Sequence, residues 1–335
     1  MWIGKPTETD RSMKPNRLPL IISCALALAA TSHAEQTGSA HYLPGSMASF
    51  MDAFPGKPGG LAVLDFFTYY DASAPASRQF PLGGFLSSDS SATVYADTIL
   101  AVYQTHWEML GGGYAFGMAV PYVWMEVEGQ AQFVGPGGVP GPVHAVRDTS
   151  NGVGDITLYP FMLGWTDLAP DLKVDLRLGI YAPTGDYKQS QLANVGKNYW
   201  SFEPGVMVSW MSSKIGTEVT LYTGVDFNTQ NTDADYTSGT SLHFDLTVAQ
   251  HLPLFGGFVG VGANAFYYDQ ITGDSGSGAR LGDFKGMTAG VGPVVSYVHS
   301  VGDSQFLAEL KWLPEIDVDN RMKGDFIWFK FGFLF

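Results

Sequence analysis

Ser241, His243 and Asp245 carry the side-chain types of a nucleophilic hydrolase: a hydroxyl, an imidazole and a carboxylate. They alternate with apolar residues, so all three share one face if the segment is a strand. Successive residues on one strand face stand roughly 7 Å apart, which is too far for direct proton transfer. We therefore predict no catalytic residue. A lipid-acting hydrolase remains an alternative, which Ser and His side chains within hydrogen-bond reach on the protein's exterior would favour.

Two further patterns resemble ligand sites. The sequence GVGDITLYP at 152–160 is rich in glycine but lacks the order of strand, glycine loop and helix that phosphate-binding loops require. Carboxylates alternate over EIDVDN at 315–320, without the glycine and the terminal glutamate of an EF-hand calcium loop. We predict no cofactor and no metal site, and interpret 315–320 as a solvated loop that could hold a cation loosely.

Polar and apolar residues alternate in the segments that carry many of the charged side chains. In KVDLRLGIY (173–181), the apolar residues fall on one strand face and Lys173, Asp175 and Arg177 on the other. Segments 218–228 and 242–251 alternate in the same way. A charge on the lipid face near the middle of a bilayer costs several kcal/mol, so in a membrane barrel the polar faces should line the interior.

Strand parity then gives candidate residues for the lining of a solute pathway. Charges of both signs should pair across the interior, and tyrosine rings beside polar groups would suit a small aromatic solute. A salt-bridged and partly filled interior is the alternative interpretation. The candidates are Asp65, Tyr69, Tyr95, Asp97, Tyr103, Asp155, Lys173, Asp175, Arg177, Glu203, Tyr222, Asp226, His243, Asp245, Glu309, Lys311 and Lys330.

The segment 324–335 (GDFIWFKFGFLF) has the clearest alternation. Ile327 and the four phenylalanines at alternate positions from 329 to 335 share one face of a strand, whereas Trp328 and Lys330 lie on the other. A soluble β-protein could bury such a face on an edge strand. Lipid explains it better, because the outward residues of an outer-membrane barrel meet acyl chains.

Extended segments and Gly/Asp/Ser-rich breaks alternate along the chain from residue 61. The breaks are alternately short and long, as between the strands of a barrel with short periplasmic turns and longer extracellular loops, and twelve strands leave a narrow or gated passage. We predict an all-β, antiparallel up-and-down transmembrane barrel of about twelve strands. The predicted strands are 61–71, 92–108, 113–128, 153–165, 171–183, 198–211, 215–228, 240–252, 256–270, 284–299, 304–315 and 324–335.

Composition and the N-terminus agree with this fold. Only 15% of the 335 residues are charged and 14% are aromatic, and no apolar run reaches the roughly 18 residues of a spanning helix. Residues 1–34 have the form of a signal peptide cleaved after Ala34, with a possible start at Met13, which would discard the one cysteine, Cys24. The remaining chain, with a net charge of −16, has no basic cluster for nucleic acid. Residues 35–60 would form a periplasmic leader or a small plug, and 61–335 the barrel.

Several stretches resemble a bacterial outer-membrane family, "MetA-pathway of phenol degradation, putative". They include GVGDITLYPFMLGW (152–165), YAPTGDY (181–187), NVGKNYWSFEPGV (194–206) and DFNTQNTDADYTSG (226–239), and the likeness continues through 41–61, 267–297 and the aromatic tail. The resemblance covers essentially all of the chain after residue 34. It implies a monomeric outer-membrane barrel that passes hydrophobic or aromatic compounds inward.

We therefore expect a non-enzymatic outer-membrane channel for the passive uptake of small apolar or aromatic solutes. Its expected partners are lipid, lipopolysaccharide and the barrel-assembly machinery, the last through Phe335. The alternatives are the lipid-acting hydrolase and a sealed structural barrel.

Overall fold

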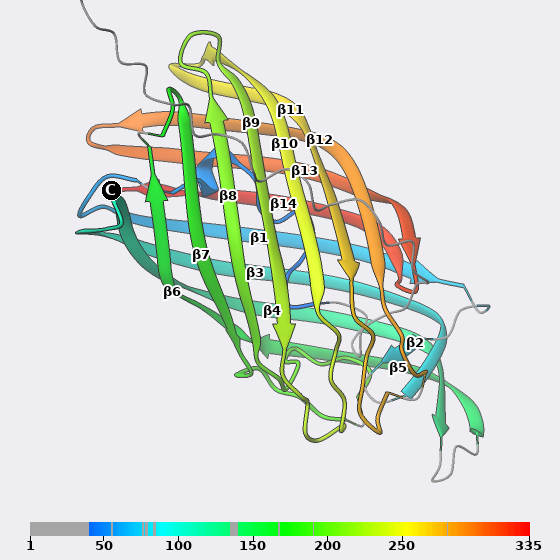
Figure 1. Cartoon of the computed structure of the whole chain (residues 1–335). Helices are drawn as coiled ribbons and strands as arrows, with labels where there is room; N and C mark the ends of the chain where they lie inside the picture. Colours follow the sequence, from blue (N-terminus) through cyan, green and yellow to red (C-terminus); the bar gives the residue numbers. More distant parts are fainter. Residues whose placement is uncertain are drawn as a thin grey trace, which may run out of the picture. The chain divides into compact units, whose positions relative to one another are not determined.

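In the part of the chain that the structure describes, antiparallel strands and one short 3-10 helix make up the regular structure (Figure 1). The computed structural model describes residues 40–54, 56–75, 77, 80–82, 85–134, 140–166, 168–189, 191–279 and 281–335. The predicted signal peptide 1–34, with its cleavage after Ala34, the start at Met13 and Cys24, lies outside the described residues. A search of the described part of the chain found no helix with the length and apolar character to cross a membrane. The elements are η1 (Phe50–Asp52), β1 (Leu61–Ala74), β2 (Phe80–Leu82), β3 (Phe85–Met109), β4 (Gly112–Val134), β5 (Pro140–Val153), β6 (Ile156–Trp165), β7 (Leu172–Ala182), β8 (Ser201–Met211), β9 (Thr217–Asn228), β10 (Ser241–Leu254), β11 (Gly257–Gln270), β12 (Met287–Val301), β13 (Ser304–Asp319) and β14 (Lys323–Leu334).

Twelve of these strands close into a ring by antiparallel pairing. β1 pairs with β14 on one side and with β3 on the other, β3 pairs with β4, and β4 pairs with β6. From β6 to β14 each strand pairs with the next in the chain. A closed ring satisfies the backbone groups that a sheet edge would leave exposed. The predicted up-and-down barrel is thus confirmed, and each of the twelve predicted segments corresponds to one strand of the ring.

The ring closes at β14, where the predicted alternation is present. Phe329 pairs with Phe67 of β1. Phe329 and Phe331 are 40% and 36% exposed, whereas Trp328 and Lys330 are 6% and 3% exposed. The aromatic row therefore covers the outer face of the ring, and the residues between point inward.

Tight turns join the strands at one end of the ring. Leu110-Gly111 and Phe255-Gly256 form two-residue turns between β3 and β4 and between β10 and β11, and all four residues have φ between +52° and +76°. Positive φ at both positions gives a type I′ turn, which matches the twist of the paired strands. The longer connections, such as 183–200 and 271–286, lie at the opposite end, as the alternation of break lengths predicted.

One side of the ring extends beyond the end with the long connections. β3 and β4 have 25 and 23 residues, and β4 pairs with β6 over 113–119 but with β5 over 122–134. The predicted loops 72–91 and 129–152 therefore contain β2, the start of β3, the end of β4 and β5, which corrects the sequence interpretation. Arg147 bonds Glu126 at 2.8 Å and Glu128 at 3.2 Å across β4 and β5. Apolar residues are sparse in β5, and proline or glycine lies near each of its ends, so hydrophobic alternation gives a weak strand signal.

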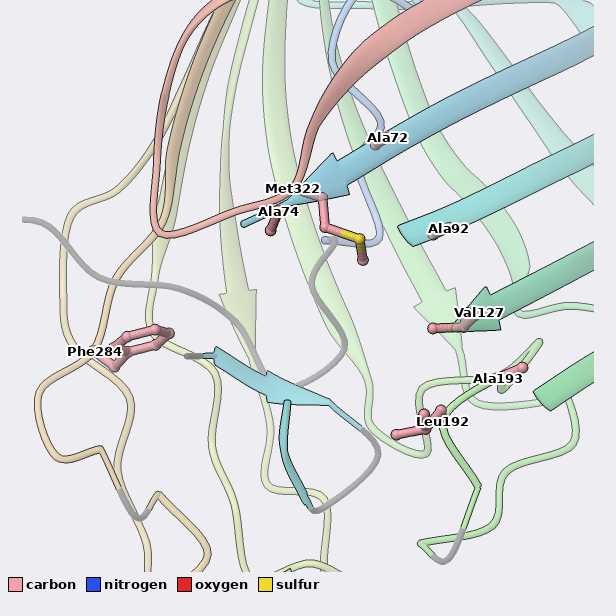
Figure 2. Packing of buried hydrophobic residues seen from close by; sticks show 8 residues of the cluster. All are labelled: Ala72, Ala74, Ala92, Val127, Leu192, Ala193, Phe284 and Met322. Carbon is pink, nitrogen blue, oxygen red and sulfur yellow. The ribbon is translucent and has the colours of Figure 1, made fainter. Parts of the chain in front are cut away.

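A small apolar cluster lies at the end with the long connections. Figure 2 shows its eight residues, which come from β1, β3, β4, the connection 183–200, the connection 271–286 and the turn before β14. Met322 lies among the strand ends in this view, and Leu192 projects from its connection. The cluster ties three connections to the wall formed by β1, β3 and β4. Its residues are Ala72, Ala74, Ala92, Val127, Leu192, Ala193, Phe284 and Met322.

Replacing Leu246 by Arg tests the outer face. Leu246 lies near the middle of β10 and is 39% exposed beside other outward apolar residues. The substitution should lower the free energy of unfolding by about 2–4 kcal/mol, the cost of an arginine on the lipid face at mid-bilayer. Urea unfolding in lipid vesicles measures it, with Leu246→Ala as the control. Equal stability of the two variants would contradict a lipid-facing β10.

Candidate functional site

Residues 40–54, here called the N-terminal segment (dark blue in Figure 1), lie inside the ring. Their backbone N–H groups donate to carboxylates on three strands. Gly45 N and Met47 N each donate to Asp245 at 3.1 Å. Phe50 N donates to Glu218 at 2.7 Å and Phe54 N to Asp175 at 3.0 Å. The carboxylates of β7, β9 and β10 thus supply the acceptors that an irregular buried backbone needs.

Basic side chains of the strands donate hydrogen bonds to backbone carbonyls and to a carboxylate of the same segment. Lys311 of β13 donates to Gly45 O at 3.2 Å and to Met47 O at 2.8 Å. Arg177 of β7 donates to Asp52 O at 2.9 Å, and Lys330 of β14 bonds the Asp52 carboxylate at 2.6 Å. Strands from distant parts of the ring therefore hold one short piece of chain. Each of these charges has a partner, as buried charges require.

The segment also brings aromatic and imidazole groups into the interior. The Tyr42 hydroxyl donates to Asp245 at 2.5 Å, and its ring stacks on His243 with 3.6 Å between centroids. Burial and the adjacent Asp245 carboxylate raise the pKa of the Tyr42 phenol well above its ordinary value, so the hydroxyl keeps its proton. His41 bonds Ser201 at 2.7 Å and Asp155 at 2.9 Å.

Asp155 links the N-terminal segment to a long connection. It lies between β5 and β6 and accepts hydrogen bonds from Gly185 N at 2.9 Å and Lys197 N at 2.8 Å, besides its contact with His41. Burial alone would raise the pKa of Asp155, but the hydrogen bond and charge of His41 and the two N–H donors lower it overall. The carboxylate therefore stays ionised and joins the His41 side chain to two backbone N–H groups of the connection 183–200.

Two residues of the N-terminal segment, a glycine and a serine, have the conformation and the capping group that this buried position requires. Gly45 has φ +82°, and a Cβ there would lie 2.3 Å from Leu313 Cδ1, so the position requires glycine. Ser49 caps η1, and the Asp52 side chain accepts from Ser49 N at 2.9 Å in a reciprocal capping box.

Twelve of the predicted lining residues lie on the inner side of the ring. Eleven are buried, and Lys173 is half-buried beside the interior. Several hold the N-terminal segment, and Glu309 pairs with Lys311 and Lys330 at 3.3 and 3.5 Å. Glu203, Asp226 and His243 gather on β8 to β10, and Tyr222 donates to Glu203 there. Their role in lining a solute pathway stays a prediction. The twelve are Asp155, Lys173, Asp175, Arg177, Glu203, Tyr222, Asp226, His243, Asp245, Glu309, Lys311 and Lys330.

The other five predicted residues were assigned to the wrong face. Residues paired directly across two strands point to the same side of a sheet. Asp65 pairs with Phe331 and Asp97 with Phe67, both of which are outward residues. The corrected outward residues are Asp65, Tyr69, Tyr95, Asp97 and Tyr103.

The error has a physical cause in β1 and β3. We assumed that a charged residue marks the inner face, but here the inner face is apolar as well. Leu64, Phe66 and Ala96 are buried toward the interior. The two outward carboxyls, Asp65 and Asp97, contact each other.

Two cavities lie along this apolar wall. One of about 500 Å³, here the short-turn cavity, is lined by residues such as Gly60, Asp303 and Phe335. The other, of about 270 Å³, is the long-loop cavity and reaches Leu192 and Met322. Met47, Leu100 and Tyr159 line both cavities. The cavities therefore meet at these three side chains, where the N-terminal segment approaches β3 and β6.

Sequence reasoning missed the apolar side of the interior. Alternate residues of β3 and β4 line the long-loop cavity, and all of them except Thr98 have apolar side chains. Small residues at alternate positions from 92 to 96 were a signal for this face, which we did not use. The strand residues concerned are Ala92, Val94, Ala96, Thr98, Leu100, Ala119, Pro121, Val123, Met125 and Val127.

A pair of neighbouring cysteines tests the corrected face of β3. A fluorophore on Asp97→Cys should be quenched strongly by brominated lipid, because residue 97 faces outward. The same label on Ala96→Cys should be quenched weakly or react slowly, since Ala96 is 7% exposed and lines the long-loop cavity. Phe67→Cys, on the outer face, is the positive control. Stronger quenching at 96 than at 97 would restore the original assignment.

The fold matches that of a solved outer membrane protein. The crystal structure of an outer membrane channel from Pseudomonas putida F1 superposes with a TM-score of 0.57 and 16% identity, over 88% of this chain and 100% of that chain. The β domain of the Bordetella autotransporter BrkA gives a TM-score of 0.43 and 12% identity, over 83% of this chain and 99% of that chain. The first likeness shows a shared barrel fold.

Sequence comparison gives the family. No curated protein matches the chain. The family model described as "Putative MetA-pathway of phenol degradation" matches residues 76–331, which span the barrel from the end of β1 into β14. The chain belongs to this family.

Proposed function

We propose that the protein is an outer-membrane channel for the passive uptake of small hydrophobic or aromatic compounds. The solute passes between the N-terminal segment and the apolar inner wall of β1, β3 and β4. The path enters at the long-loop cavity and leaves through the short-turn cavity. The protein supplies a shaped passage and no covalent chemistry.

The meeting of the two cavities at Met47, Leu100 and Tyr159 carries this proposal. Met47 belongs to the N-terminal segment, whereas Leu100 and Tyr159 belong to the wall. A Met side chain has three rotatable bonds and adapts its shape easily, so it suits a constriction that opens for a passing solute. The cavity volumes, about 270 and 500 Å³, are comparable with those of small-molecule sites.

The distribution of polarity supports an apolar solute. Charged side chains of β7 to β14 are largely occupied by the N-terminal segment and by one another. The wall opposite them offers aliphatic and aromatic surface, with the Tyr159 and Tyr181 side chains among the polar groups at the long-loop cavity. Apolar contact with a few hydroxyl partners is what a phenol-sized molecule requires.

We place the barrel in the bacterial outer membrane, in contact with lipid and lipopolysaccharide. The apolar outer face and the family membership support this location. Phe335 directly follows β14, and its backbone N–H donates to Leu61 O at 2.8 Å. Its exposed ring is the group through which we expect the barrel-assembly machinery to recognise the chain.

A sealed structural barrel is the second candidate, because the N-terminal segment fills much of the interior. The hydrolase alternative receives less support. Ser241 and His243 lie inside the ring, and Ser241 Oγ accepts from the Tyr268 hydroxyl at 2.7 Å. A lipid substrate outside the barrel would not meet these side chains.

Flux of simple phenols into vesicles tests the channel, with single-channel conductance as the electrical counterpart. Leu100→Ala and Met47→Ala should each raise phenol flux several-fold, because they widen the place where the cavities meet. Ile99→Ala, the outward neighbour of Leu100 at 47% exposure, should leave flux unchanged. A phenol should also block conductance in a saturable way. Wild-type barrels with no flux and no conductance, and no gain in either alanine variant, would favour the sealed barrel.

A further inference from the structure

Three inward side chains on neighbouring strands converge beneath the N-terminal segment. They are Glu203 of β8, Asp226 of β9 and His243 of β10, with 1%, 1% and 0% exposure. One oxygen of each carboxylate and one ring nitrogen lie within 4.8 Å of one another. No other group of three or more His, Cys, Asp or Glu side chains gathers in this way in the part of the chain that the structure describes.

Backbone register explains why the three meet. Phe202 pairs with Phe227, so Glu203 and Asp226 occupy the next positions inward on the two antiparallel strands. Like charges at such positions repel each other and destabilise a sheet unless a positive charge lies between them. His243 pairs with Gly224, two residues from Asp226 on the same face of β9.

Glycine makes the convergence possible. A Cβ at Gly224 would lie 2.6 Å from His243 Nε2 and 3.1 Å from Glu203 Oε1. Any larger residue at this position would displace the imidazole from the carboxylates. A Cβ at Gly179 would lie 3.2 Å from Glu203 Oε2, so a second glycine leaves room on the other side of the glutamate.

Hydrogen bonds do not explain why the imidazole of His243 is buried at this position. Among the described residues neither ring nitrogen of His243 has a hydrogen-bond partner of acceptable geometry, although Nε2 lies 3.2 Å from Glu203 Oε1. The other buried histidines differ. His251 bonds one carboxylate, that of Glu218, at 2.7 Å, and His41 bonds Asp155 at 2.9 Å. His243 thus has a fully buried ring that faces two carboxylates, and its one close contact, with Glu203, lacks the geometry of a hydrogen bond.

The surroundings of Glu203 resemble the outer shell of a metal site. The hydroxyls of Tyr181 and Tyr222 each donate to its carboxylate at 2.5 Å. Hydrogen bonds of this kind orient a ligating carboxylate in metal centres. They leave further lone pairs on the glutamate, because two carboxylate oxygens offer about four acceptor positions.

We propose that Glu203, Asp226 and His243 bind one divalent transition-metal ion of the Zn²⁺ type. Imidazole with carboxylates is a donor set that suits Zn²⁺ and its neighbours, whereas Ca²⁺ and Mg²⁺ take oxygen ligands in larger number. A divalent cation balances two buried carboxylates, which removes the cost of burying like charges side by side. The ion joins β8, β9 and β10, and the Tyr42 ring stacked on His243 covers it with the N-terminal segment.

Metal titration of the purified full-length barrel, prepared without a histidine tag and stripped with a chelator, tests the proposal. The wild-type protein should bind one Zn²⁺ per chain and resist heat denaturation in detergent better with the ion than without it. His243→Asn should weaken Zn²⁺ binding by about 100-fold or more, since it removes a ligand rather than an outer-shell group. His251→Asn is the matched control, a buried histidine beside a single carboxylate, and should bind as the wild type does.

Three results would overturn the proposal. The first is a folded wild-type barrel that binds no Zn²⁺. The second is a folded His243→Asn variant that binds it as tightly as the wild type, which would place the ion on exposed carboxylates. If that variant fails to fold, Asp226→Asn replaces it, with the same loss expected. The third result needs no variant. It is an X-ray absorption spectrum at the zinc edge of the wild-type complex that lacks the scattering of an imidazole ligand.

Discussion

Hydrogen bonds from inward charged side chains to the backbone of residues 40–54 are the interaction on which the interior depends. A short piece of chain without regular structure carries N–H and C=O groups that cannot be buried unpaired. Asp245 accepts two of these N–H groups and the Tyr42 hydroxyl, and Lys311 donates to two carbonyls. Because acceptors and donors come from different strands, the segment is fixed in direction as well as in position. Removal of one such charge would leave its partners buried without a hydrogen bond, so these residues act together.

This arrangement divides the interior into two halves of different chemistry. The side formed by β7 to β14 carries the charges and is occupied by the segment and by ion pairs such as Lys330 with Asp52. The inward side chains of β1, β3 and β4 are largely Ala, Val, Leu and Thr, and both cavities border this side. Space thus remains beside a stretch of wall whose inward side chains carry few charges. The charged residues that drew attention in the sequence serve chiefly to hold the N-terminal segment.

The sequence alone was sufficient to predict those features that the alternation of polar and apolar residues determines. The twelve strands of the ring and the outward aromatic row of β14 follow from residue periodicity, because lipid requires one apolar face on each strand. The same reasoning failed for Asp65 and Asp97, since β1 and β3 are apolar on both faces and a single carboxylate does not identify the inner one. It failed for β5, where apolar residues are sparse and proline or glycine lies near each end. Glu203, Asp226 and His243 are separated by 23 and 17 positions without a spacing motif, so only the strand register could bring them together.

The extension of β3 and β4 beyond the ring has a consequence for contact with other chains. Within the ring every strand pairs on both sides, whereas β2 and β5 each pair with one strand in the part of the chain that the structure describes. Their outer edges carry backbone donors and acceptors that a further strand could pair with, the feature that leads sheets to associate edge to edge. Charged side chains discourage such pairing, and Arg147 of β5, with Glu126 and Glu128 of β4, places a cluster of charges on this part of the sheet. The barrel therefore combines a closed ring without free edges and a short rim on which charges oppose further strand pairing.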